Sequence, residues 1–234
     1  MKELPNRYLL GIAVLLLLNS CSIYYAPNAH NVPLFKGKDD VRISIIASHG
    51  GYDYKGTEIQ GAYAITDKIG LITNGFIAHA EDDNSPKSGE GSFLEIGAGY
   101  YKPLNKFFVF ETYNGIGAGE VYNMYRDRSS STVNFLKYFI QPSIGFSSKV
   151  FDAALSSRFC ALHYYSIQSN SMENTGNLLG LKYDVPLLIE PALTLRLGWK
   201  NVKIQGQYGL SFILNNPEFD HDGLNLNVGL YIGI

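Results

Sequence analysis

Nine charged residues stand singly within otherwise apolar, alternating stretches of the sequence. Four are acids and five are bases, so their charges nearly balance. They are Arg42, Glu58, Glu95, Glu111, Lys137, Arg158, Glu190, Arg196 and Lys203. A charge in an apolar setting must be paired and hydrogen-bonded. This set could therefore form a network of buried ion pairs, or it could line a narrow polar channel or a small-ligand pocket.

A second set of residues could do acyl-transfer chemistry. Residues 163–173 resemble the histidine, serine and acid set of outer-membrane lipid A deacylases. The members of this set here are His163, Ser166, Ser169, Asn170 and Glu173. In those enzymes a single residue separates the histidine from the serine, whereas here two residues do. A regular strand would place His163 and Ser166 on opposite faces, and a triad needs its members to converge. We therefore predict no catalytic residue.

Two histidines stand beside acids and could contact a metal ion. His79 lies near Glu81, and His221 lies between Asp220 and Asp222. Single histidines in loops or at strand ends are more often solvated than metal-bound, and neither pair has the spacing of a known ligand motif. The sequence predicts no metal site and no cofactor.

The N-terminus predicts export and a lipid anchor. Lys2 and Arg7 precede an apolar run over residues 9–18, which is too short to span a bilayer and has the proportions of a signal peptide. Leu18-Asn19-Ser20-Cys21 resembles the lipobox of bacterial lipoproteins, which implies cleavage after residue 20 and acylation of Cys21, for example with palmitate. Cys160 is the only other cysteine, so no disulfide is expected.

Composition narrows the class of protein. The chain has 24 glycines, 17 tyrosines and 13 phenylalanines, which favours strands over helices. Its net charge of −2 gives no basic surface for nucleic acid. Residues 21–40 show no periodicity and are interpreted as a lipidated tether, whereas residues 41–234 are interpreted as one β-domain.

Alternating patterns predict ten strands, with eight as the alternative count. The expected strands cover 41–48, 57–65, 69–80, 92–101, 107–119, 133–147, 151–165, 187–198, 202–213 and 224–234. Short connections alternate with the longer polar loops 49–56, 81–91, 120–132, 166–186 and 214–223. This arrangement is typical of a closed antiparallel up-and-down membrane β-barrel with short periplasmic turns and longer outer loops.

The alternation also indicates which face meets lipid. Leu193, Leu195 and Leu197 share one face of a strand, and Thr194 and Arg196 share the other. A soluble barrel would have the apolar face inside, so we assign the apolar faces to lipid and the nine charges to the lumen. Five aromatic residues in the outward register beside short turns support an interfacial girdle: Tyr100, Phe108, Phe146, Phe151 and Trp199. Because the interior of so small a barrel mainly holds side chains, a salt-bridged plug is favoured over a channel.

An even strand count places both ends of the barrel on the short-turn side. We therefore expect a lipid on Cys21 to lie in the inner leaflet, with the N-terminus facing the periplasm. Residues 25–35 (Tyr25 to Phe35) and 60–70 (Gln60 to Gly70) also resemble a family of uncharacterised Bacteroidota outer-membrane β-barrel lipoproteins. That resemblance implies a place in the envelope of a Gram-negative bacterium and carries no activity.

The sequence thus predicts a lipid-anchored outer-membrane barrel with a structural or binding role and no catalysis. Its expected partners are outer-membrane lipid and, through loops 81–91, 120–132 and 166–186, other envelope proteins or a small ligand. Two alternatives stay open. One is a lipid-modifying barrel enzyme, and the other is a lipid-tethered soluble barrel that binds a hydrophobic ligand.

Overall fold

The computed structural model describes residues 23–51, 54–81, 88–170, 178, 180–199, 201–217 and 219–234. Its strands are β1 (Val41–Gly50), β2 (Lys55–Ala64), β3 (Ile69–Glu81), β4 (Ser88–Pro103), β5 (Phe108–Met124), β6 (Ser130–Ser147), β7 (Phe151–Ser169), β8 (Leu187–Gly198), β9 (Val202–Leu210), β10 (Phe212–Ile213) and β11 (Leu224–Gly233). Both β9 and β10 pair with the same edge of β8, so these eleven segments make up ten strands around the barrel.

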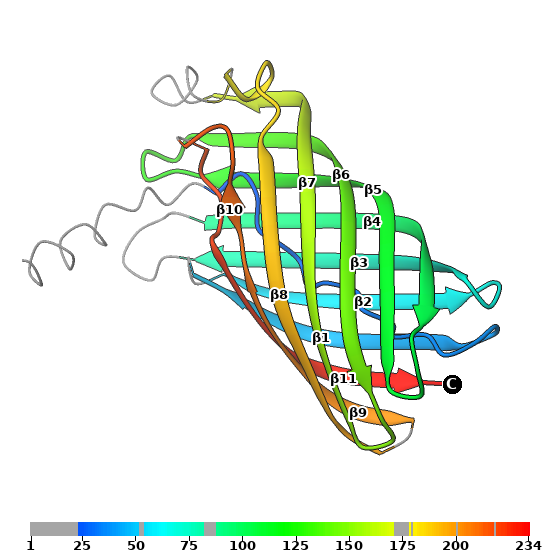
Figure 1. Cartoon of the computed structure of the whole chain (residues 1–234). Coiled ribbons are helices and arrows are strands. Elements are labelled where there is room, and N and C mark those ends of the chain that lie inside the picture. The colour runs from blue at the N-terminus through cyan, green and yellow to red at the C-terminus, as the bar shows by residue number, and fades with distance from the viewer. Residues whose placement is uncertain are drawn as a thin grey trace, which may run out of the picture.

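The strands form one closed barrel (Figure 1). Every pairing is antiparallel, and β1 pairs with both β2 and β11 while β9 joins β11 to β8. Closure removes the free sheet edges that would otherwise expose unpaired backbone groups. The predicted ten-stranded up-and-down barrel is confirmed.

The outer wall of the barrel is apolar, as the alternation predicted. Ile59, Ile77, Leu94, Ile204 and Val228 are among its members, and their side chains are 59–66% exposed. The soluble-barrel alternative requires the opposite facing and is wrong on this point. Among the described residues, no helix has the length and apolar character needed to cross a bilayer.

The two ends of the barrel differ. At one end four short turns join β2 to β3, β4 to β5, β6 to β7 and β8 to β9, and both the start of β1 and the C-terminus lie there (Figure 1). The five aromatic residues predicted to form the girdle lie beside the short turns at this end: Tyr100, Phe108, Phe146, Phe151 and Trp199. We call the opposite end, where the long loops emerge, the long-loop rim.

At the long-loop rim the strands extend further than predicted. The segment 120–132, predicted as a loop, is mostly a projecting hairpin in which Glu120 pairs with Asn134 and Met124 with Ser130. Its tip is a turn over Tyr125–Ser129 with Arg128 at a positive φ of 65°. Polar residues led to the loop interpretation, but an antiparallel hairpin that projects from the barrel can face water on its outer side and tolerates them.

The predicted tether is the largest departure from expectation. Residues 24–35, here called the N-terminal plug, are almost all buried and run through the lumen between the two mouths (Figure 1). The segment lacks periodicity because its surroundings are the inward side chains of a barrel rather than a sheet with one buried face. The plug therefore belongs to the barrel domain.

Candidate functional site: the occupied lumen

All nine predicted charges lie on the inward face of the barrel. Eight are at most 3% exposed, and Arg42 is partly buried near the short-turn end. Asp152, which the sequence interpretation missed, is also buried on the inward face, beside Lys203. The strand register could have identified it, because Phe151 points outward and the next residue must then point inward.

The centre of the lumen is organised by one residue of the N-terminal plug, Asn28. Its Nδ2 donates to Oε1 of Glu58 and of Glu95, each at 3.1 Å. Its Oδ1 accepts from Lys137 Nζ at 3.0 Å and from Arg158 Nη1 at 2.8 Å. A single amide thus donates to two carboxylates and accepts from two cations.

Arg158 ties the plug to the wall by several contacts. Its Nη2 donates to the Ala29 carbonyl oxygen at 3.3 Å, and its Nε and Nη2 donate to Gln141 Oε1 at 3.0 and 2.9 Å. Ion pairs join it to Glu95 at 3.4 Å and to Glu190 at 3.9 Å. Glu190 in turn accepts a hydrogen bond from the Tyr25 hydroxyl at 2.8 Å.

A second cluster of charges contacts the plug toward the short-turn end. Lys203 Nζ lies 2.6 Å from Asp152 Oδ1, and Arg196 Nη2 donates to the Val32 carbonyl oxygen at 2.8 Å. Glu111 Oε1 accepts from the backbone N–H of Phe35 at 3.0 Å. Both ends of the plug and its middle are therefore held by the charges that the sequence singled out.

Backbone groups of the plug are also matched by uncharged lumen side chains. Gln207 accepts from the His30 N–H at 2.7 Å and donates to the His30 carbonyl oxygen at 3.0 Å. Gln60 donates to Ala29 O and Gln141 to Asn31 O. These residues were missed because a glutamine in a strand gives no signal of its partner, which here lies up to 177 positions away.

Leu34 adopts a left-handed backbone conformation with φ of 53° although it is bulky and buried. Such a conformation is strained for a bulky side chain. Its side chain packs with Val32, Val109 and Ala154, which fixes it there. The turn at Leu34 lets the chain leave the lumen and enter β1.

The long-loop mouth is partly sealed by apolar residues. Leu178, Leu181 and Phe219 from the loops pack with Tyr24 and Tyr164 in the buried cluster. Burial raises the pKa of the nearby Asp220 carboxyl, an effect that His221 partly offsets.

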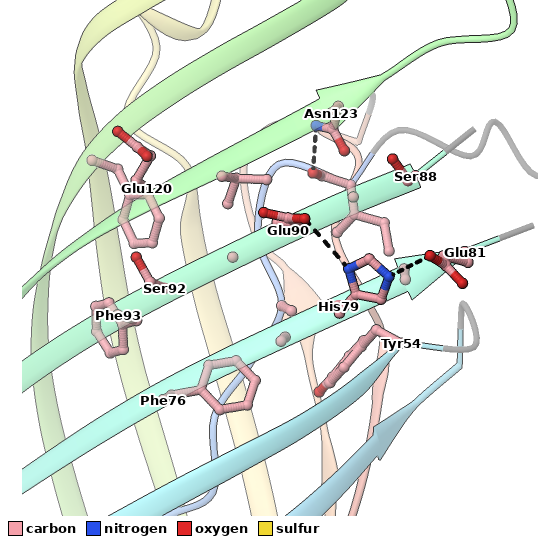
Figure 2. Close-up of a pocket in the computed structure, with 18 residues that line it drawn as sticks. Tyr54, Phe76, His79, Glu81, Ser88, Glu90, Ser92, Phe93, Glu120 and Asn123 are labelled. Carbon is pink, nitrogen blue, oxygen red and sulfur yellow. Dashed lines mark hydrogen bonds and ion pairs between the residues drawn. The ribbon is translucent and has the colours of Figure 1, made fainter. Parts of the chain in front are cut away.

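A small pocket remains at the mouth beside β3 and β4 (Figure 2). Its volume is about 110 Å³, and the rings of Tyr54, Phe76 and Phe93 lie around it. Ligand pockets for drug-sized molecules are typically about 300–1,000 Å³, so this one has room for a few carbon atoms only.

The predicted histidine sites take two different forms. His79 pairs with Glu81 at 2.9 Å and with Glu90 at 3.8 Å on the exposed outer face (Figure 2). His221 lies in the rim, where both ring nitrogens contact backbone carbonyl oxygens. Within the described ranges, no three His, Cys, Asp or Glu side chains are grouped to hold a metal ion.

The expectation that His163 and Ser166 lie on opposite faces is wrong. A β-bulge shifts the register of β7 so that His163 pairs with Leu136 and Ser166 with Asn134. Directly paired residues share a face, and Leu136 and Asn134 both point outward, so the histidine and the serine do too. Glu173 lies outside the described residues, and no hydrogen bond joins His163 to Ser166 in the described part of β7.

Comparisons with known proteins give likeness at the level of the barrel. No protein-family model matches the chain, and no curated protein matches it. Among solved structures, the translocator domain of the autotransporter NalP from Neisseria meningitidis has a TM-score of 0.49 at 10% identity, covering 97% of this chain and 94% of that one. An outer-membrane channel from Pseudomonas putida has a TM-score of 0.48 at 10% identity, covering 89% and 100%. KdgM porin has a TM-score of 0.40 at 13% identity, covering 82% and 98%. These similarities are low, and neither a family nor a function follows from them.

Proposed function

We propose that the protein is an outer-membrane barrel that its own N-terminal segment closes, with a structural or binding role in the envelope and no transport through the lumen. The observation that carries this proposal is the match between the N-terminal plug and the lumen charges. Asn28 alone contacts two acids and two bases, and all five residues are at most 2% exposed.

The apolar wall supports the membrane location. Large aliphatic side chains cover the outside of several neighbouring strands, and burying each in lipid rather than water is favourable by about 1.5–3 kcal/mol. A wall of this kind on a monomer in water would aggregate. Lipid acylation at Cys21 remains part of the proposal, and Cys21 itself lies outside the described residues.

The role in binding falls to the long-loop rim. The β5–β6 hairpin projects there with Arg126, Asp127 and Arg128 exposed at its tip. Rigid scaffolds commonly carry recognition on such projecting segments. We therefore assign contacts with envelope proteins or a small ligand to the rim, and none to the lumen.

Electrical recording tests the closed lumen. We expect the purified full-length chain, inserted into a planar lipid bilayer, to give no steady ion conductance, because the plug and its buried ion pairs occupy the centre of the lumen. An unplugged porin recorded in the same bilayer is the positive control. A steady ohmic current carried by the wild-type chain would show that the lumen conducts and would remove the proposal.

A lipid-modifying enzyme is a second candidate, and the bulge in β7 is the observation in its favour. We expect lipid extracted from cells that express His163→Ala to match lipid from cells that express the wild type. Ser166→Ala serves as the matched variant on the same face. Loss of a deacylated lipid species in both variants would establish the enzyme instead.

A further inference from the structure

We propose that a lipid on Cys21 lies in the outer leaflet, at the long-loop rim, and that the polypeptide crosses the membrane through its own barrel. This inference rests on the proposed outer-membrane barrel and deepens it. It replaces the expectation of an inner-leaflet anchor, which assumed that the chain before β1 stays on the short-turn side.

The direction of the N-terminal plug is fixed by contacts at its two ends. At the long-loop rim, Asn123 Nδ2 donates to the Ile23 carbonyl oxygen at 3.1 Å (the dashed line from Asn123 in Figure 2). The Tyr24 N–H donates to Asp220 O at 3.0 Å. At the short-turn end, Lys36 Nζ donates to the carbonyl oxygens of Lys106 and Ser147 at 2.9 and 3.1 Å. The chain therefore enters the barrel at the rim and leaves it at the short turns.

The distance along the chain decides which leaflet Cys21 can reach. Only one residue separates Cys21 from Ile23, and a fully extended chain spans at most about 3.6 Å per residue, so this short stretch can cover no more than about 7 Å. The apolar band of an outer-membrane barrel is about 25 Å tall. The inner leaflet is thus out of reach, and the lumen that could lead back to it is occupied by the plug.

The height of the rim matches the outer boundary of the apolar band. Ile23 lines the same mouth pocket as His79, Glu81 and Glu90. These polar side chains belong to β3 and β4 and lie nearer to the rim than the exposed, apolar Ile77. Acyl chains on a cysteine at this height have lipid within reach only on the outer side. Each methylene buried there contributes about 0.8 kcal/mol, which draws the chains over the rim into that leaflet.

Thiol labelling in intact cells tests this placement, because two positions on the same segment should lie on opposite sides of the membrane. Ser22→Cys and Lys38→Cys are compared, and Asp127→Cys at the hairpin tip reports the orientation of the barrel. Cys160 is buried and gives the background. Palmitate labelling of the wild type and of Cys21→Ala is run in parallel.

We expect a membrane-impermeant maleimide to label Ser22→Cys and Asp127→Cys in intact cells, and Lys38→Cys only after the outer membrane is opened. Label at the tip without label at position 22 would overturn the inference while leaving the proposed barrel intact. Label at position 38 without label at the tip would mean a reversed barrel and would overturn both. Absence of Cys21-dependent palmitate would overturn the inference alone. If Ser22→Cys fails to fold, an epitope inserted between residues 22 and 23 and probed with antibody on intact cells gives the same decision.

Discussion

Arg158→Met lowers the free energy of unfolding by about 3–5 kcal/mol, the largest single-residue effect that we expect in this chain. Methionine roughly fills the space of the aliphatic part of the side chain but leaves Glu95 and Glu190 without their shared cation. It also removes the hydrogen bonds that Arg158 donates to Asn28 Oδ1 and to the Ala29 carbonyl oxygen, which leaves Lys137 and Gln60 as their donors from the barrel wall. The measurement is the urea concentration at which half of the barrel is unfolded. Migration of unheated samples in gels distinguishes the folded from the unfolded chain.

Arg126→Met is the matched control because Arg126 is exposed at the hairpin tip. Surface substitutions of this kind usually change stability by less than about 0.5 kcal/mol. Equal urea midpoints for Arg158→Met and Arg126→Met would show that the buried ion pairs contribute little to holding the plug.

Asn28→Asp destabilises the folded chain by about 3 kcal/mol although it barely changes the shape of the side chain. The oxygen that replaces Nδ2 would face Glu58 and Glu95 at the 3.1 Å now spanned by hydrogen bonds, so two attractions become repulsions. We expect Glu58→Gln to restore part of the loss in the double variant, because it removes one of the two opposing charges. Urea unfolding of the wild type, of Asn28→Asp, of Glu58→Gln and of the double variant forms a double-mutant cycle.

The control for this prediction is the same substitution at Asn105, whose side-chain amide only accepts hydrogen bonds. Asn105 Oδ1 accepts from the N–H groups of Phe107 and Phe108 at 2.8 and 3.0 Å in an exposed turn, and an aspartate preserves both bonds. Asn105→Asp should leave the urea midpoint unchanged. A similar loss in both variants would mean that added charge, rather than the geometry around Asn28, explains the effect.

The barrel wall was predictable because its information is local. Residues 193–197 of β8 alternate between leucines that face outward and Thr194 and Arg196, which face inward, and this alternation gives the facing of the strand. The strand ends at the long-loop rim were less predictable, since both faces of the hairpin at 120–132 carry polar residues.

The N-terminal plug was not predictable from local pattern. Most of its hydrogen bonds to the wall join residues far apart in the chain, such as His30 with Gln207, and no alternation marks a chain that is surrounded on all sides. The bulge in β7 escaped notice for a related reason, because only its pairing with β6 reveals the extra residue. The resemblance to Bacteroidota barrel lipoproteins stays a prediction, and the residues that carry it include the plug.

The enclosed plug also has a consequence for how the chain folds and how long it stays folded. The N-terminal plug lies inside a ring whose closure, between β1 and β11, is made by the final residues of the chain. The Pro33 carbonyl oxygen accepts from the Tyr231 hydroxyl across 198 positions, so the plug and the closing strand must come together in one late step. Contacts of such long sequence separation make folding slow. The same topology slows the reverse process, because the plug cannot be released until the ring of backbone hydrogen bonds opens, and the lifetime of the folded state is then set by a barrier rather than by equilibrium stability alone.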